Sequence, residues 1–223
     1  MLTLVIGDKN YSSWSLRAWL LMTEAGIAFD EVALPLSTPT FATEIGRHTP
    51  AGRVPVLIDD EVGPEPLHVW DTLAIAEYLA ERFDDRLLWP ADRADRARAR
   101  SICAEMHAGF QALRSAMPMN ISADLAGLGW SVQVQDDVDR IVELWSECLE
   151  RSGGPMLFGR LSIADAFFAP VVSRLTTYGV ALPETADAYR RRVLALDGMR
   201  AWFAAARAET HFLAEDEPYR RRA

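Results

Sequence analysis

The chain has 223 residues, of which 50% are hydrophobic and 25% are charged, so it is long enough for one large globular domain or two small ones. Its formal net charge of -9 disfavours non-specific binding to nucleic acid or to anionic membranes. No apolar run approaches the ~18 residues that a membrane-spanning helix needs, and the first residues do not resemble a signal peptide. Cys103 and Cys148 are too few for a disulfide framework, and we therefore expect a cytoplasmic protein.

The first part of the chain alternates short β-like runs with helical runs. The predicted strands are 2–6, 29–34, 56–58 and 67–69, and the predicted helices are 13–25, 42–47 and 71–83. The order begins with a βαβ unit, which needs a parallel pair, and ends with a hairpin and a helix. This pattern predicts an α/β, thioredoxin-like N-terminal domain over residues 1–84.

After a short linker, the pattern becomes helical throughout. One apolar stripe at spacings of four, four, three and four predicts a single face of a long helix: Ile102, Met106, Phe110, Leu113 and Met117. Further helices are predicted around 138–149 and at 163–178, 185–196 and 198–208. We therefore expect an all-α C-terminal domain over residues 91–223.

Three serines stand where the first helix is predicted to begin: Ser12, Ser13 and Ser15. Serine is a preferred N-cap residue, so helix capping explains them on general grounds. The same position also suits a binding site, because a helix N-terminus attracts anions and a hydroxyl there can lower the pKa of a thiol by hydrogen bonding to its thiolate. The sequence leaves both interpretations open.

Three other segments carry signals at the boundaries of elements. Pro55 precedes a strand, and a cis Val54–Pro55 bond would turn the Val54 backbone outward to pair with an extended peptide, although a plain turn explains it equally well. Asp71 and Thr72 begin a helix, and capping alone accounts for them. The pair Ser162 and Asp165, three residues apart, predicts a capping box that fixes the start of a core helix.

Together these segments resemble the cytosolic glutathione S-transferase family over nearly the whole chain, with a thioredoxin-like domain followed by a helical one. Ser12-x-x-Ser15-x-Arg17 is similar to the first-helix motif of the serine classes, and Ser12-Ser13-Trp14-Ser15 is similar to that of the zeta class, with Trp14 in place of a cysteine. Segments 50–57, 71–79 and 162–165 resemble other family motifs. Thr49 stands where asparagine is usual, and Asp71-Thr72 stands where Glu-Ser is more common.

The resemblance implies the roles of individual residues. Ser12 would be catalytic and would donate a hydrogen bond to the glutathione sulfur, while Val54 would pair through its main chain with the cysteinyl part. Thr72 and the start of its helix would hold the γ-glutamyl carboxylate, Asp71 the ammonium group, and Arg53 the glycyl carboxylate. Ser13 would assist in glutathione binding, and Tyr11 is the alternative partner of the sulfur.

The implied function is that of a glutathione transferase, which uses the glutathione thiolate on small electrophiles, with glutathione as substrate or cofactor and no metal. A zeta-like cis–trans isomerase of a maleyl-type diacid and a non-catalytic binding module are the alternatives. The second substrate, hydrophobic or electrophilic, would lie between the domains, where candidate wall residues are Phe110, Arg114, Met117 and Met119. A core position is the commoner explanation for the three apolar ones. The resemblance also implies a homodimer, with no nucleic acid or membrane partner.

Overall fold

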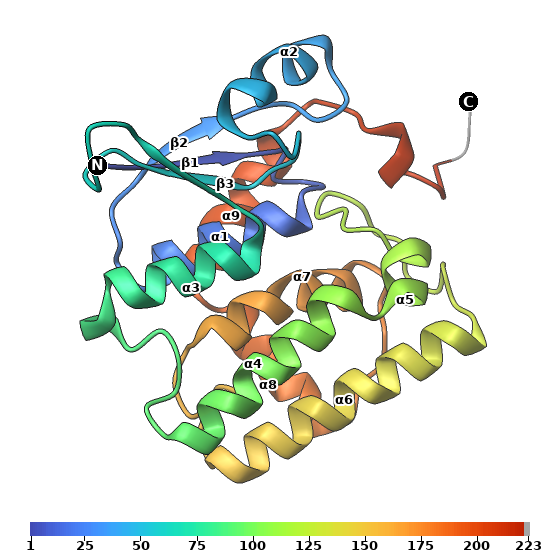
Figure 1. The fold of residues 1–223 in the computed structure, drawn as a ribbon. Coiled ribbons are helices and arrows are strands. Elements are labelled where there is room, and N and C mark those ends of the chain that lie inside the picture. The colour runs from blue at the N-terminus through green and yellow to red at the C-terminus, as the bar shows by residue number, and fades with distance from the viewer. Residues whose placement is uncertain (221–223) are drawn as a thin grey trace.

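The computed structural model describes residues 1–220, and its elements divide into a sheet with flanking helices and a set of packed helices (Figure 1). The strands are β1 (Leu2–Ile6), β2 (Asp30–Ala33), β3 (Val56–Asp59) and β4 (Leu67–Trp70). The α-helices are α1 (Ser13–Glu24), α2 (Pro39–His48), α3 (Thr72–Arg82), α4 (Arg93–Ala108), α5 (Gln111–Ala116), α6 (Val132–Ser152), α7 (Ile163–Thr177), α8 (Glu184–Leu194) and α9 (Asp197–Ala208). Two short 3₁₀ helices are η1 (Asp84–Arg86) and η2 (Ala214–Asp216).

The sheet has the strand order β2-β1-β3-β4, with β1 parallel to β2 and the other pairs antiparallel. Successive side chains of β1 point to opposite faces, so Leu4 and Ile6 join the core formed with α1 and α3, whereas Val5 joins a smaller core with α2. Figure 1 shows α1 and α3 on one side of the sheet and α2 on the other. This arrangement confirms the predicted thioredoxin-like domain.

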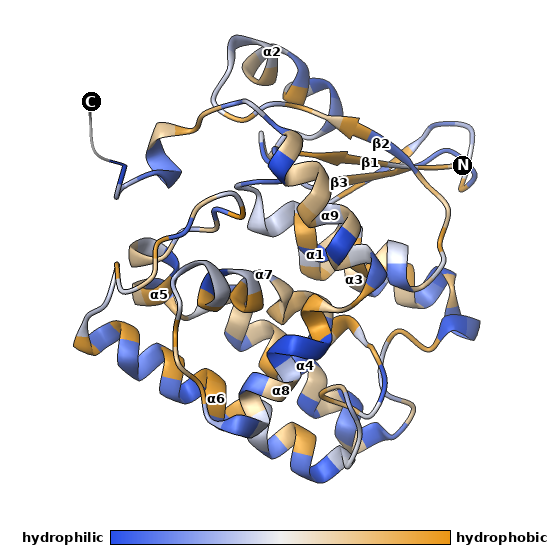
Figure 2. Cartoon of the chain, turned by 180° about the vertical axis from the view of Figure 1, so that it is seen from behind, coloured by the Kyte–Doolittle hydropathy of each residue, from blue (hydrophilic) through white to orange (hydrophobic). Residues whose placement is uncertain are grey.

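The helical part is organised around α7, in which every residue except Thr176 is buried. Helices α1, α4 and α8 all contact α7. Figure 2 shows the hydropathy alternating along α6, because one side of this helix faces the core and the other faces solvent. The predicted all-α second part is therefore confirmed, and none of the helices described is long and apolar enough to cross a bilayer.

The end of the helical part returns to the start of the chain. In α9, the indole nitrogen of Trp202 donates a 2.9 Å hydrogen bond to the Lys9 carbonyl, and the Gly198 amide donates one of 2.7 Å to the Glu24 carboxylate. Helix α1 thus contacts α3, α7 and α9 and shares the main core with side chains of β1 and β3. Its N-terminus consequently opens where the two parts of the molecule meet.

The predicted single long helix through residues 102–117 is wrong. The structure breaks it into α4 and α5, and Phe110 between them has a left-handed backbone with φ of 57°. A side chain at Gly109 would place its Cβ 2.8 Å from the Glu105 carbonyl oxygen, so the turn needs a glycine there. The apolar residues on both sides of the break still pack into the same core, so the apolar spacing continues from α4 into α5.

The predicted capping box at the start of α7 is confirmed. The Asp165 carboxylate accepts hydrogen bonds from the Ser162 amide at 2.9 Å and the Ser162 hydroxyl at 3.0 Å. It also accepts from the Leu157 amide at 3.1 Å and the Tyr189 hydroxyl at 3.0 Å. One fully buried carboxylate therefore satisfies donors from three segments of the helical core.

Asp165→Ala is expected to lower the free energy of unfolding by about 3–5 kcal/mol, because it leaves several buried donors without an acceptor. Ser131→Ala, which removes the N-cap of the half-exposed helix α6, should cost only about 1 kcal/mol. Denaturant unfolding followed by far-UV circular dichroism measures both. Equal losses in the two variants would contradict the role assigned to Asp165.

Candidate functional site

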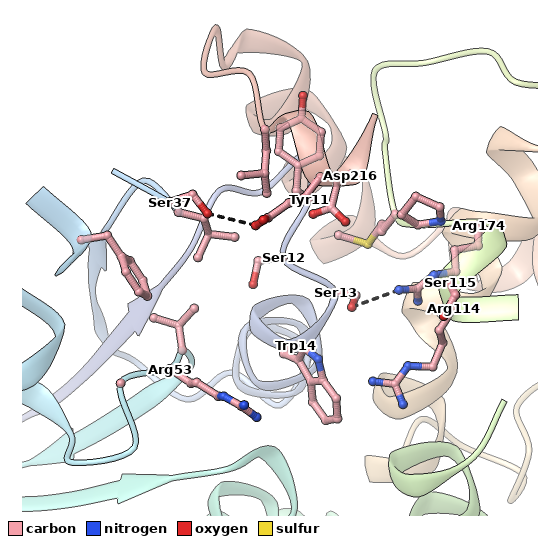
Figure 3. Close-up of a pocket in the computed structure, with 18 of the residues that line it drawn as sticks. Tyr11, Ser12, Ser13, Trp14, Ser37, Arg53, Arg114, Ser115, Arg174 and Asp216 are labelled. Carbon is pink, nitrogen blue, oxygen red and sulfur yellow. Dashed lines mark hydrogen bonds between the residues drawn. The ribbon is translucent and has the colours of Figure 1, made fainter. Parts of the chain in front are cut away.

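A cavity of about 510 Å³ lies at the seam between the sheet part and the helical part. Figure 3 shows Ser12 and Ser13 at its centre, Arg53 on one side, and Arg114 and Arg174 on the other. A second cavity of about 370 Å³ adjoins it and includes Pro55, Asp71 and Thr72. The two cavities share four lining residues, which are Trp14, Arg53, Val54 and Arg114. The joined cavities bring together all the site residues predicted from the sequence.

Ser12 is the N-cap of α1, and its hydroxyl accepts a 3.3 Å hydrogen bond from the Ser15 amide. The same hydroxyl lies 2.7 Å from the Ser15 hydroxyl, to which it donates, and Ser15 in turn accepts from the Gly7 amide at 3.1 Å. This chain of hydrogen bonds ties the end of β1 to the first turn of α1. Ser12 therefore caps the helix and lines the cavity at once, so that capping and ligand binding are compatible.

The neighbours of Ser12 have their hydroxyls engaged elsewhere. The Tyr11 hydroxyl donates a 2.9 Å hydrogen bond to Glu217 in the C-terminal segment, and burial together with this carboxylate raises the pKa of Tyr11. The Ser13 hydroxyl accepts a 3.2 Å hydrogen bond from Arg174. Of the three hydroxyls, that of Ser12 is bonded only within its own helix turn, which favours it over Tyr11 as the partner of a ligand sulfur.

The segment before β3 contributes backbone to both cavities. The Val54–Pro55 peptide bond is cis, as the sequence analysis predicted. Val54 lines both cavities, and Arg53 is an exposed residue whose guanidinium reaches in from the side opposite Arg114 (Figure 3).

Asp71 and Thr72 form the start of α3, at the floor of the second cavity. Asp71 has φ of 74°, and its carboxylate accepts a 2.8 Å hydrogen bond from the Leu73 amide. The Thr72 hydroxyl is buried and has no hydrogen-bond partner among the residues described. An unpartnered buried hydroxyl is costly, so this group is free for a ligand at the N-terminus of the helix.

His107 on α4 is a site residue that the sequence analysis missed. Its Nε2 lies 3.3 Å from the Asp71 carboxylate, and its ring packs edge-on against Trp14 with ring centroids 5.0 Å apart. Burial lowers the pKa of His107 despite the nearby carboxylate, which favours the neutral ring. No sequence pattern links α4 to the start of α3, so no local signal pointed to this histidine. Within residues 1–220, no group of three or more His, Cys, Asp or Glu side chains is arranged to hold a metal.

Three arginines from separate helices lie on one side of the site. Arg17 of α1 is buried and stacks between Trp14 and Phe167, at 4.3 and 4.9 Å from the ring centroids. Burial and the neighbouring Arg114 and Arg174 charges lower the pKa of Arg17 to about 9. The buried Arg174 of α7, whose pKa falls to about 10 for similar reasons, donates to the Met117 carbonyl at 2.9 Å. The sequence had pointed to Arg17 and Arg114 but not to Arg174.

The apolar wall candidates divide between core and cavity. Phe110, Met117 and Met119 are all buried in the core, as their helical stripe indicated, and of these Met119 also lines the larger cavity.

The site residues fall within regions that match known family models. The model described as "Glutathione S-transferase, N-terminal domain" matches residues 11–82, and the one described as "Glutathione S-transferase, C-terminal domain" matches residues 96–205. The chain therefore belongs to the glutathione S-transferase family.

Individual relatives are distant. The chain is 25% identical over 166 residues to a probable maleylacetoacetate isomerase from Caenorhabditis elegans, covering 74% of each chain. It is 25% identical over 182 residues to glutathione S-transferase 1 from Dianthus caryophyllus, covering 78% of this chain and 79% of the relative. A glutathione transferase homologue from Burkholderia, solved with bound glutathione, superposes with a TM-score of 0.69 at 24% identity over 92% of this chain and 98% of that one. Ure2p in complex with glutathione gives a TM-score of 0.70 at 19% identity, over 91% and 93% of the two chains. At these identities the structures show the shared fold.

Asp216 in η2 lines the larger cavity, and burial together with Glu215 and Glu217 raises its pKa to about 6 from 3.8. A raised pKa means that the folded state favours the protonated acid, so stability is lost as the pH rises through about 6. Asp216→Asn should therefore raise the free energy of unfolding by about 1–2 kcal/mol at neutral pH, after discounting for solvent screening, and by progressively less below about pH 6.

Denaturant unfolding across this pH range measures the effect, with Glu81→Gln as a control at an exposed position of α3. A gain of the same size in acid and at neutral pH would contradict the assigned ionisation.

Proposed function

We propose that this protein binds glutathione in the joined cavities and uses its thiolate to attack small electrophilic substrates. The observation that carries the proposal is the convergence of three separate segments on one site: the start of α1 at Ser12, the main chain of Val54, and the start of α3 at Asp71 and Thr72. Each supplies groups that match a different part of a γ-glutamyl tripeptide.

The proposed binding mode follows the chain of the tripeptide. The Val54 N–H and C=O groups pair with the cysteinyl backbone, as in the addition of a strand to a sheet edge. The Thr72 hydroxyl and the N–H groups of α3 hold the γ-glutamyl carboxylate, and Asp71 holds the ammonium group. Arg53 binds the glycyl carboxylate, and Ser13 borders the sulfur. Asp71 is positioned for its role by the neighbouring His107.

Ser12 is the proposed catalytic residue. A free thiol has a pKa near ~8.5, so lowering it by ~2 units needs roughly 2.7 kcal/mol of preference for the thiolate. The Ser12 hydroxyl donates to Ser15 in the free protein and turns its one proton to the sulfur when glutathione binds. A hydrogen bond to a charged sulfur, worth about 1.5–3 kcal/mol, together with the positive end of α1, is of that size. The thiol proton passes to solvent and the sulfur forms a bond to carbon. The leaving group departs with its bonding electrons, or the acceptor carbon takes up a proton.

A glutathione-dependent isomerase of a maleyl-type diacid is the second candidate. It is supported by the Ser12-Ser13-Trp14-Ser15 motif and by the similarity to the probable maleylacetoacetate isomerase. In that reaction the thiolate adds to the double bond and leaves again after rotation. Product analysis separates the two, because a transferase yields a stable thioether and an isomerase regenerates glutathione. A two-fold homodimer and a cytoplasmic location stay predictions.

Thr72→Val should weaken glutathione binding about tenfold or more, because it removes a hydrogen bond to a charged carboxylate. It should leave the stability of the free protein unchanged or slightly higher, because the hydroxyl has no partner within the described residues. Thr177→Val is the matched control, since its hydroxyl donates to the Asn120 carbonyl at 2.9 Å and its loss should cost stability. Calorimetry and thermal unfolding provide the two readouts, and intact glutathione affinity in Thr72→Val would contradict the binding mode.

Ser12→Ala should reduce turnover by about 10- to 100-fold while changing glutathione affinity little, because it destabilises the thiolate and not the bound tripeptide. The ultraviolet absorbance of the thiolate, followed against pH, should show the pKa of the bound thiol rising. Ser131→Ala controls for the loss of a helix cap away from the site. An unchanged rate in Ser12→Ala would exclude this serine and make Tyr11 the next residue to test.

A further inference from the structure

The side of the larger cavity opposite Arg53 carries positive charge that the proposed glutathione site does not use. Arg114 and Arg174 line this cavity (Figure 3). The guanidinium of Arg17 lies 4.3 Å from the centroid of the Trp14 ring, which also lines the cavity. The Arg114 guanidinium also stacks over the Trp14 ring, 4.9 Å from its centroid. We call Arg17, Arg114 and Arg174 the arginine wall.

The arginine wall forms no ion pair. Among residues 1–220, no carboxylate lies within 4.0 Å of any of its three guanidinium groups. By contrast, other arginines of α4 and α6 are paired: Arg98 with Glu147, Arg100 with Glu77, and Arg140 with Glu105. The neighbouring helices thus pair other arginines with carboxylates, but they place no carboxylate within ion-pair distance of the wall.

The contacts that the wall does make are to neutral groups. Arg174 donates to the Met117 carbonyl and the Ser13 hydroxyl, and Arg114 donates to the His107 carbonyl at 3.2 Å. The Nε and Nη1 atoms of the buried Arg17 have no partner among the residues described. Burying several like charges without an anion is costly, and such an arrangement is characteristic of a site that is completed by a ligand.

The acidic residues at the cavity act on the wall only from beyond ion-pair distance, where Asp216 opposes the lowering of the Arg174 pKa and Asp71 that of Arg17. Asp216 and Glu215 approach from the C-terminal segment, where Glu215 accepts a hydrogen bond from Ser37 at 2.9 Å. Asp71 lies in the second cavity and faces His107. None of these three carboxylates forms an ion pair with the wall within residues 1–220.

Glutathione itself brings two carboxylates, and in the proposed binding mode Arg53 and the start of α3 already hold them. The wall flanks Ser13, on the side of Ser12 opposite Arg53, and Arg114 also borders the second cavity (Figure 3). An electrophile on this side of Ser12 would lie next to a sulfur held there. Met119, Pro118 and Leu213 add apolar surface to the same cavity.

We infer that the second substrate is a small carboxylate-bearing electrophile with an apolar body, whose carboxylate binds Arg114 and Arg174. This inference rests on the proposed function, since it places the substrate beside a glutathione sulfur at Ser12. Guanidinium groups bind carboxylates by short, charge-assisted hydrogen bonds, and the stacking of Arg17 and Arg114 on Trp14 keeps the wall in place.

Two S-substituted glutathiones test the inference by binding alone. S-(4-carboxybenzyl)glutathione places a carboxylate where the second substrate would lie, and S-(4-carbamoylbenzyl)glutathione is its neutral isostere. Isothermal titration with the full-length protein should give a Kd for the carboxylate at least about tenfold lower than for the amide. Arg114 is only half buried, so the protein should tolerate its replacement. In Arg114→Gln, the preference for the carboxylate conjugate should fall to about threefold or less.

Arg174→Gln should reduce the preference for the carboxylate conjugate in the same way. Arg174 is buried, and if its replacement prevents folding, Arg114→Gln still tests the wall by itself. Arg93→Gln removes an equal charge from an exposed position of α4 and should keep the full preference. Equal affinities of the two conjugates for the unaltered protein would overturn the inference while leaving glutathione binding intact. A loss of affinity for glutathione itself in Arg114→Gln, as large as for the carboxylate conjugate, would also overturn it, because the wall would then serve glutathione. Failure of the unaltered protein to bind glutathione would instead overturn the proposed function.

Discussion

The packing of α1 between the sheet on one side and α7 on the other is the constraint on which the rest of the structure depends. The hydrogen bonds from Gly7 to Ser15 and from Ser12 to Ser15 join the end of β1 to the first turn of this helix. Because most of α1 is buried, its N-terminus is the end that lines the cavity between the two parts of the molecule. A ligand there would touch both parts, as the proposed function requires of glutathione on the sheet side and a second substrate on the helical side.

The electrostatics of the site differ from those of the chain as a whole. The protein carries a formal net charge of -9, whereas the lining of the joined cavities balances Arg53, Arg114 and Arg174 against Asp71, Glu215 and Asp216 and also includes the positive ends of α1 and α3. Trp14 organises this charge, because Arg17, Arg114 and His107 all pack against its ring. Its ring thus gives one aromatic surface to three side chains from α1, α4 and α5. The charge is unevenly spread, because the arginines lie around Trp14 and Ser13 while Glu215 and Asp216 come from the C-terminal segment.

Several features followed from short-range patterns. The strand order of a βαβ unit and hairpin, the capping box of Ser162 and Asp165, and the cis bond before Pro55 each depend on residues a few positions apart, and the structure contains all of them. The break between α4 and α5 did not follow, because the apolar stripe continues through the left-handed residue Phe110. Hydrophobic periodicity shows only which side chains face the core. A turn that keeps the same side chains facing the core therefore cannot be detected from the periodicity.

The sequence by itself determined the two-part architecture, the positions of the helix starts and the family resemblance, because capping, turn chemistry and hydrophobic periodicity act locally. It also singled out Ser12, Val54, Asp71 and Thr72, each at the end of an element. Only the tertiary structure decided which distant groups meet them. The approach of His107 to Asp71, and of Arg174 to Ser13, joins residues far apart in the chain. These contacts depend on how α4 and α7 pack against α1, and no local pattern encodes that packing because it results from the shape of the whole core.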